Sequence, residues 1–230
     1  MGTKRAFVDN LSLSLVRGIP LGEEEGIGAL TIPGYLRDVC SRYAQREALV
    51  LHRPASVVRW SYQDLWDHSV EVAKALIDCG VGKDCRVGIL MTNRPEYLSA
   101  VFGTAMAGGV AVALSTFSTP AELGHLIAAS GIAILLFEDK VLKTDFAAML
   151  ATLEPGVLSS APGELASTTF PFLRHIVRLD GLTGVHDNGD TAAGNVVAYE
   201  SWDTFVARAT SVNDAVVAAR AATVMPCDAG

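Results

Sequence analysis

The sequence feature that most constrains the fold is an alternation of apolar runs and helical patterns between residues 86 and 137. Three mainly apolar runs, at 86–91, 110–114 and 132–137, are separated by two segments with helical periodicity. Continuous apolar runs are typical of strands that are buried on both faces, as in parallel sheets. The alternation therefore predicts an α/β fold with a mainly parallel sheet, right-handed crossovers and helices on both faces.

Capping residues mark where several helices are expected to begin. Ser61 is followed three residues later by Asp64, and Thr119 by Glu122, which is the spacing of a capping box. The segment Asn93-Arg94-Pro95-Glu96 offers asparagine as a cap, proline in the first turn and glutamate at the capping-box position. A helix is expected to follow each of these three starts.

The remaining segments are less regular. Residues 1–30 are expected to form an irregular N-terminal segment, and 48–51 and 57–60 to pair as a hairpin. Clusters of Pro, Gly, Ser and other turn residues make 154–172 and 180–195 loop-rich. Apolar spacing predicts further regular elements, which are a strand at 175–179 and helices at 36–43, 140–153, 201–209 and 213–224.

Composition restricts the classes of partner. The 230 residues carry a net charge of -7, with 18 Lys and Arg against 25 Asp and Glu. An acidic chain without clustered basic residues is not expected to bind nucleic acid or an anionic membrane surface. The longest nearly uncharged run, 97–121, is interrupted by Gly108-Gly109 and is interpreted as two elements rather than a transmembrane helix.

The cysteines and histidines show no spacing typical of a metal site. The four cysteines form no CxxC pair, and no histidine lies at zinc-finger spacing from them. His68 is interpreted as a histidine at the edge of the core, and the turn that begins at His186 as solvated rather than calcium-binding. Lys4-Arg5 is not followed by the apolar region of a signal peptide. These features predict reduced thiols in a cytoplasmic protein.

Nucleotide-binding loops are incomplete in this sequence. Gly80-Val81-Gly82-Lys83 resembles the end of a P-loop, but residue 77 is isoleucine where glycine is needed, and Asp84 replaces Ser or Thr. Gly26-Ile27-Gly28 lacks both a preceding strand and the third glycine of a dinucleotide-binding loop. From these patterns we predict no catalytic, cofactor-binding or metal-ligating residue within the chain.

The best polar candidates lie in one loop. Ser115, Thr116, Phe117 and Ser118 follow an expected buried strand, at the edge where α/β proteins often bind ligands. We predict that these four residues line a substrate channel. The alternative is that the loop only caps the helix that follows it.

Several segments, taken in order, resemble the acyl-adenylate-forming enzymes, which include acyl-CoA synthetases, luciferases and the adenylation domains of peptide synthetases. Trp60-Ser61-Tyr62-Gln63-Asp64-Leu65 is similar to their Leu-Thr-Tyr-x-Glu-Leu motif, and 106–114 to their second core motif. Gly80-Val81-Gly82, Asn93-Arg94-Pro95-Glu96 and 119–123 occur in the same order and spacing. The ordered series, which extends over residues 30–230, carries the resemblance more than any single motif.

The resemblance implies an acyl-CoA synthetase rather than an amino-acid-activating domain. Residues 112–116 read Val-Ala-Leu-Ser-Thr, where peptide synthetases usually have Tyr-Val-Pro-Leu-Asp. The implied ligase activates a carboxylic acid of fatty-acid type with ATP and then transfers the acyl group to coenzyme A. Magnesium would neutralise the phosphates during the first step.

The resemblance also implies that residues 31–230 are an incomplete N-terminal α/β domain. In the family, a phosphate loop follows a segment like 225–229, and a C-terminal lid domain carries a catalytic lysine; neither is in this sequence. We therefore expect a fragment that is inactive alone, exposes apolar surface near its last helix and self-associates. The alternatives are a non-catalytic α/β binding or interaction module and a Rossmann-type oxidoreductase, which the missing glycines disfavour.

Overall fold

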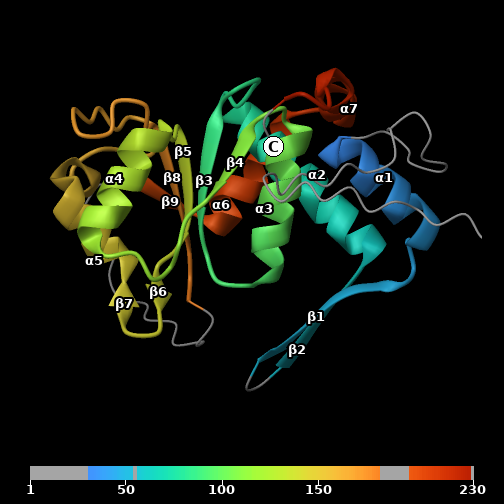
Figure 1. Cartoon of the computed structure of the whole chain (residues 1–230), viewed down its shortest axis with the longest axis horizontal. Coiled ribbons are helices and arrows are strands. Elements are labelled where there is room, and N and C mark those ends of the chain that lie inside the picture. The colour runs from blue at the N-terminus through green and yellow to red at the C-terminus, as the bar shows by residue number, and fades with distance from the viewer. Residues whose placement is uncertain (1–30, 54–55, 182–196, 229–230) are drawn as a thin grey trace, which may run out of the picture.

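A parallel sheet organises the computed structural model, which describes residues 31–53, 56–181 and 197–228 (Figure 1). Its strand order is β4-β3-β5-β8-β9, and every neighbouring pair is parallel. The chain winds from β3 to β4 in one direction and then crosses to β5 on the other side of β3. The strands are β4 (Val110–Ala113), β3 (Arg86–Leu90), β5 (Ile134–Glu138), β8 (His175–Leu179) and β9 (Tyr199–Ser201).

Helices cover both faces of this sheet, as the sequence predicts (Figure 1). Alternate residues of a strand point to opposite faces, so Leu135 packs in the core on one side and Leu136 in the core on the other. One face carries α4 (Pro120–Ser130) and α5 (Phe146–Leu153), and the other carries α2 (Tyr62–Asp78), α3 (Pro95–Met106) and α6 (Trp202–Ala207). The α/β class with a mainly parallel sheet is confirmed.

The helices α2 and α3 pack closely because Gly103 has no side chain. A Cβ atom at Gly103 would lie 2.8 Å from Cγ1 of Val72 and 2.9 Å from the backbone oxygen of Ser69. Outside this pair lie α1 (Ile32–Tyr43) and α7 (Asp214–Thr223), which share a third core cluster with α2 and α3. The pair α2 and α3 therefore lies between the sheet on one side and the outer helices α1 and α7 on the other.

The N-terminal hairpin and two of the predicted caps are confirmed. β1 (Glu47–Arg53) pairs antiparallel with β2 (Ser56–Ser61). Ser61 caps α2 in a complete capping box, in which Asp64 accepts a hydrogen bond from the Ser61 backbone. Thr119 and Glu122 make the same arrangement at the start of α4. Local side-chain chemistry therefore fixes where α2 and α4 begin.

The predicted cap of α3 is wrong. The helix begins at Pro95, its capping position is Arg94, and no side-chain hydrogen bond caps it. Because Arg94 and not Asn93 is the cap, Glu96 is at the second position of the helix, one before the position that a capping box needs. Its carboxylate instead accepts hydrogen bonds from the Arg94 guanidinium.

The segment 140–153 is only partly helical. It begins with two short antiparallel strands, β6 (Lys140–Val141) and β7 (Thr144–Asp145), before α5. Leu142 adopts a left-handed φ of 56° in the turn and is 88% exposed, so it does not belong to an apolar helix face. Asp145 caps α5 by accepting a hydrogen bond from the backbone of Ala148.

Other segments differ in smaller ways from the prediction. The loop-rich stretch 154–172 includes a short 3-10 helix, η2 (Pro155–Leu158), and β9 was not predicted. α6 is followed by a second 3-10 helix, η3 (Arg208–Ser211), so the predicted helix 201–209 is two elements. Residues 1–30, the turn at His186 and most of 180–195 lie outside the described residues. Among the helices that the structure describes, none is long and apolar enough to cross a membrane.

Candidate functional site

A buried glutamate connects β3 to β5 at the carboxyl edge of the sheet, which is the side at which the parallel strands end. Glu138 ends β5 and is 1% exposed. Its Oε2 atom accepts hydrogen bonds from the backbone nitrogen of Thr92 at 3.0 Å and from the Thr92 hydroxyl at 2.7 Å. Thr92 follows β3, and β3 and β5 are the strands between which the winding direction changes. This is the position at which open α/β sheets usually bind ligands.

Arg94 occupies the centre of this edge. Its side chain is 7% exposed and forms two hydrogen bonds with Glu96, at 2.8 and 3.2 Å. It also donates to the backbone oxygen of Asp180 at 2.9 Å and lies 3.5 Å from Oε1 of Glu138. Arg94 thereby links α3 to the ends of β5 and β8. Buried charges of this kind are tolerated because they are paired and hydrogen-bonded.

A cavity of about 360 Å³ lies beside Arg94. Its lining includes Arg53 and Arg178, together with the acidic residues Glu96 and Asp203. Both signs of charge are present, and Arg178 also lies over the ring of Tyr199. The cavity is therefore not a concentrated anion site, and Arg94 is already committed to carboxylates. The described residues of this edge do not fit the triphosphate of ATP.

The loop of Ser115–Ser118 lies at the end of β4 at the same edge of the sheet. The Ser115 hydroxyl accepts a hydrogen bond from the backbone of Phe117, and the Ser115 backbone oxygen accepts one from Ser118. Thr116 and Ser118 are half-buried, and the Phe117 side chain is 87% exposed. The structure thus gives the loop a local turn next to the capping box of α4. Its predicted part in a substrate channel stays a prediction.

His68 is on the surface rather than at the edge of the core. Its side chain is 45% exposed and interacts with Glu71 at 3.2 Å. The imidazole ring stacks on Trp60 of β2, with 4.3 Å between ring centroids. The interpretation of His68 as a core-edge residue is therefore wrong, because the hairpin offers an aromatic surface outside the core.

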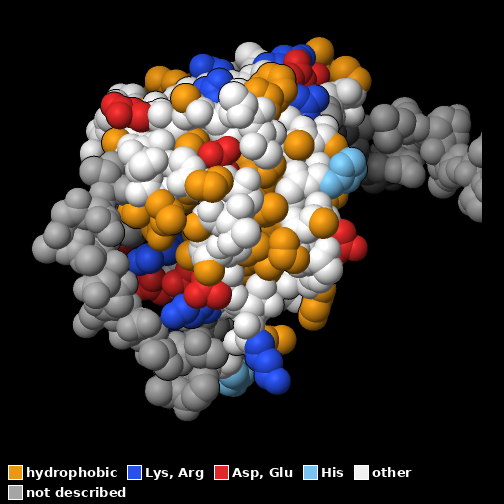
Figure 2. Space-filling view, turned by 90° about the vertical axis from the view of Figure 1, so that its left-hand side faces the viewer, with side chains coloured by type: hydrophobic (Ala, Val, Ile, Leu, Met, Phe, Trp, Pro, Cys, Tyr) orange, Lys and Arg blue, Asp and Glu red, His pale blue; other side chains and the backbone are white. Residues whose placement is uncertain are grey.

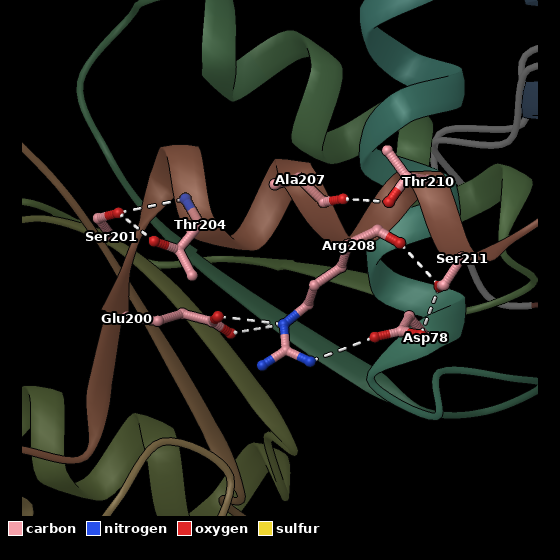
Figure 3. A network of polar contacts seen from close by, with 8 residues as sticks. All are labelled: Asp78, Glu200, Ser201, Thr204, Ala207, Arg208, Thr210 and Ser211. Carbon is pink, nitrogen blue, oxygen red and sulfur yellow. Dashed lines mark hydrogen bonds and ion pairs between the residues drawn. The ribbon is translucent and has the colours of Figure 1, made fainter.

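A second polar cluster lies at the opposite, amino edge of the sheet (Figure 3). Arg208 begins η3, and its Nε donates to both carboxylate oxygens of Glu200 in β9, at 3.2 and 3.1 Å. Its Nη1 donates to Asp78 at the end of α2, at 3.2 Å. The Ser211 hydroxyl donates to the other oxygen of Asp78 at 2.6 Å. The network fastens α2, β9 and η3 to one another.

Cys79 and His175 extend this network. One ligand atom from each of Cys79, His175 and Glu200 lies within 4.8 Å of the other two. Nδ1 of His175 is buried and has no hydrogen-bond partner among the described residues. A Cβ atom at Gly163 would lie 2.9 Å from Cε1 of His175, so the imidazole packs directly against the backbone there. The cluster therefore combines a thiol, an imidazole and a carboxylate that come from three elements.

The charges of this cluster follow from burial and pairing. Burial raises the pKa of the Cys79 thiol to about 12, and nearby Glu200 and Asp78 add to this effect. Burial lowers the pKa of His175, and the Arg208 charge lowers it further. The Ser211 hydrogen bond and Arg208 hold the pKa of Asp78 below its ordinary value. At neutral pH the cluster contains a thiol, a neutral imidazole and ionised Asp78.

Sequence patterns did not reveal either buried network. Arg94 and Glu138 belong to different strand ends, and Cys79, His175 and Glu200 are far apart in the chain. Their proximity depends on the strand order, which places β8 and β9 beside the end of α2. The only local signal was Glu96, which was assigned to a helix cap instead of a buried ion pair.

A groove of about 680 Å³ lies between the outer helices. It is lined by residues of α1, α2 and α7, which include Trp66, Val70, Val217 and Ala221. Val216 on α7 and Met225 after it are 40% and 50% exposed. Apolar side chains are also exposed on the side formed by α4 and α5 (Figure 2). Apolar surface near the last helix agrees with the expectation from the sequence.

Comparison with protein families decides the assignment. Residues 36–170 match the family model described as AMP-binding enzyme, and these residues are more than half of the chain. The chain belongs to the AMP-binding enzyme family. The match spans the elements from α1 to the loop after η2, which include the capping boxes and the strands β3, β4 and β5.

Relatives within this family are named as acyl-CoA ligases. The chain is 30% identical over 163 residues to the putative acyl-CoA synthetase YngI of Bacillus subtilis. The aligned region covers 70% of this chain and 29% of the relative. It is 32% identical over 114 residues to the acyl-CoA ligase sidI of Aspergillus fumigatus, covering 50% and 19%. For the human mitochondrial medium-chain acyl-CoA ligase ACSF2, the identity is 26%, covering 73% and 26%. The matched region is thus less than a third of each relative.

Solved structures show the same fold. The anthranilate CoA ligase AuaEII, in complex with anthranoyl-AMP, aligns with a TM-score of 0.56 at 19% identity, over 79% of this chain and 28% of that chain. The N-terminal domain of FACL13 from Mycobacterium tuberculosis aligns with a TM-score of 0.52 at 21% identity, over 80% and 36%. At these identities the likeness supports the fold and not a substrate.

Proposed function

We propose that this chain is part of an ATP-dependent acid–thiol ligase, which activates a carboxylic acid of fatty-acid type as acyl-AMP and transfers it to coenzyme A. The observation that carries the proposal is the family match over residues 36–170, together with relatives named as acyl-CoA ligases. Because the chain spans less than a third of those relatives, the activity is proposed for the longer protein.

The proposed reaction has two steps. A carboxylate oxygen of the acid attacks the α-phosphorus of ATP, and the bond to pyrophosphate breaks. The sulfur of coenzyme A then attacks the acyl carbonyl carbon, its proton is lost, and AMP leaves. Magnesium would neutralise the phosphate charge. The residues described here hold the sheet together at both edges, and none of them is assigned to the phosphates.

Residues 31–230 are proposed as an incomplete N-terminal domain that does not adenylate an acid by itself. Two observations support this. The chain covers 29% of the Bacillus subtilis relative and 26% of the human one, and the carboxyl-edge arginine is committed to carboxylates. We also infer a cytoplasmic location, because all four cysteines are unpaired.

The test begins with the coding sequence beyond the codon for Gly230. The 230-residue chain and the full open reading frame are then assayed for carboxylate-dependent exchange of pyrophosphate with ATP, with acids of different chain length. We expect exchange, and acyl-CoA formation, only from the longer protein. Exchange by the 230-residue chain would contradict its proposed inactivity. A stop codon next to Gly230, without exchange, would favour the non-catalytic module.

The Ser115–Ser118 loop is proposed to contact the acyl substrate through Phe117. The supporting observation is that this large apolar side chain is 87% exposed at the carboxyl edge. In the active longer protein, Phe117→Ala is expected to raise KM for the acid severalfold while KM for ATP stays unchanged. Leu142→Ala is the matched control, because Leu142 is an equally exposed apolar residue in another turn. Equal effects of both changes would exclude a specific contact.

A further inference from the structure

Three potential metal ligands of different chemical type meet at the amino edge of the sheet. Cys79 follows α2, His175 begins β8, and Glu200 lies in β9. One ligand atom of each lies within 4.8 Å of the other two. We propose that Cys79, His175 and Glu200 form a binding site for a divalent cation of the zinc type. The site does not depend on the proposed ligase reaction.

The ligand set selects the class of metal. A sulfur, an imidazole nitrogen and a carboxylate oxygen are the ligands that Zn²⁺ and Co²⁺ accept together, whereas Mg²⁺ prefers oxygen ligands alone. Three protein ligands leave a fourth tetrahedral position for water. Cys79 and His175 are each half-buried, so the cluster lies near the surface of the protein and not in its core.

Each of the three ligands has binding capacity that the protein does not use. Nδ1 of His175 is buried without a hydrogen-bond partner, and Cys79 is a free thiol. Both carboxylate oxygens of Glu200 accept a hydrogen bond from Nε of Arg208. Each oxygen has two lone pairs, so one lone pair on each is still available to a metal. A metal can therefore bind Glu200 while Arg208 keeps its hydrogen bonds.

The surrounding charges favour a divalent cation. When Cys79 binds a metal it loses its proton, so Cys79, Glu200 and Asp78 are then all negative. Among the described residues, Arg208 is the positive charge that pairs with both carboxylates in the network of Figure 3. Two negative charges remain uncompensated, and a divalent cation neutralises them. The network thus fits a metal better than it fits an ionised thiol alone.

Binding requires a small closure of the cluster. In a tetrahedral site with the usual metal–sulfur and metal–nitrogen bonds, ligand atoms are roughly 3.3–3.8 Å apart. The ligand atoms here lie within 4.8 Å of one another, so they must approach by at most about 1.5 Å. Cys79 follows the end of α2, and rotation about its Cα–Cβ bond moves the sulfur while the packed His175 ring and the sheet stay in place.

The test is a titration of the reduced 230-residue chain with Co²⁺, followed by absorption spectroscopy. We expect one equivalent of Co²⁺ to produce a thiolate-to-cobalt charge-transfer band and visible d–d bands typical of tetrahedral geometry, and Zn²⁺ to abolish both. Mg²⁺ in excess is expected to leave the bands unchanged. Absence of a charge-transfer band would overturn the proposal.

Variants assign the band to the cluster. Cys79→Ser is expected to remove the charge-transfer band, and His175→Gln to weaken Co²⁺ binding by about tenfold or more. Cys85→Ser is the matched control, because Cys85 is also a half-buried free thiol and lies in the same connection between α2 and β3. A band that persists in Cys79→Ser, or that disappears in Cys85→Ser, would contradict the site. Circular dichroism verifies that each variant keeps its helices.

Discussion

Two arginines link elements of this molecule through carboxylates, one at each edge of the sheet. Arg94 at the carboxyl edge has a side chain that is 7% exposed, and it contacts Glu96, Glu138 and the backbone of Asp180. Arg208 at the amino edge is 32% exposed and contacts Glu200 and Asp78. Both connect residues that are distant in the chain, but they differ in what surrounds them.

The difference lies in the polar groups that remain. Glu138 is also bonded to the backbone and hydroxyl of Thr92, so Arg94 and Glu138 are committed to holding β3, β5 and β8 together. Nε of Arg53, which lines the neighbouring cavity, is the buried atom at this edge that has no hydrogen-bond partner among the described residues.

At the amino edge, Cys79 and His175 are next to Glu200; Cys79 forms no disulfide, and Nδ1 of His175 is buried without a hydrogen-bond partner among the described residues. We interpret the Arg94–Glu138 network as structural, and the amino-edge network, which includes three potential metal ligands, as one that can also accept a cation.

The largest expected effect on stability comes from removing Arg94. Arg94→Met removes the hydrogen-bond partner of the half-buried Glu96 carboxylate and the ion-pair partner of the buried Glu138 carboxylate. We expect the free energy of unfolding to fall by about 3–5 kcal/mol, measured from urea denaturation midpoints. Arg59→Ala removes an exposed pair with Glu47 and serves as the control, with an expected loss below about 1 kcal/mol. Similar losses in both variants would mean that burial of the Arg94 network is unimportant.

A smaller effect is expected at the amino edge. Arg208→Met should lower the free energy of unfolding by about 1–3 kcal/mol, because solvent can reach part of this network and Ser211 still bonds Asp78. The same urea titration measures it. A loss that exceeds that of Arg94→Met would reverse the ranking of the two edges.

The capping box of α2 provides a reference without buried charge. Ser61→Ala removes the hydroxyl that accepts from the backbone of Asp64, and we expect a loss of about 1 kcal/mol. Ser61→Asn is the matched variant, because asparagine is also a good N-cap and should retain most of the stability. If the asparagine variant is as unstable as the alanine variant, the cap hydrogen bond does not explain the loss.

The smallest difference should appear in the dependence of stability on pH. Burial alone would raise the pKa of Glu96, but hydrogen bonds and charge from Arg94 outweigh it and hold the pKa below its ordinary 4.5. A carboxyl with a lowered folded-state pKa adds stability above its unfolded pKa and loses it as the pH falls through the folded-state value.

Arg94→Met removes the cause of the lowered Glu96 pKa. Below pH 4.5, the slope of the free energy of unfolding against pH should therefore become less steep, by an amount that corresponds to at most about one bound proton per molecule. Arg208→Met should change the slope less, because the Ser211 hydrogen bond is the main cause of the lowered pKa of Asp78. Urea titrations at several pH values measure both slopes. An unchanged slope in Arg94→Met would mean that Arg94 does not control the protonation of Glu96.

The regular part of the fold could be predicted because its signals are local. β3, β4 and β5 are short apolar runs. Each of the capping boxes, at Ser61 and at Thr119, needs only two residues that are three positions apart in the sequence. β9 was missed because it is three residues long and its middle residue, Glu200, is a buried acid. An isolated acidic residue does not indicate a strand unless its partner Arg208 is known.

The site-level predictions failed or stayed open for a related physical reason. His68 has the spacing of a core-facing residue, but the hairpin places Trp60 against its ring outside the core. The search for metal ligands used local spacing, whereas Cys79, His175 and Glu200 meet only after α2, β8 and β9 have packed together. Patterns within one element predict that element, and contacts between elements need the topology.

The parallel order of the described strands also bears on how the chain is made. Within the five-stranded sheet, no two neighbouring strands can be joined by a tight turn, so each pairing waits for a long crossover connection to leave the ribosome. Ser201 both ends β9 and caps α6, the helix that packs on the finished sheet. Until that residue has been synthesised, β8 presents an unpaired edge to other nascent chains. Premature termination before Ser201 would therefore produce an aggregation-prone polypeptide.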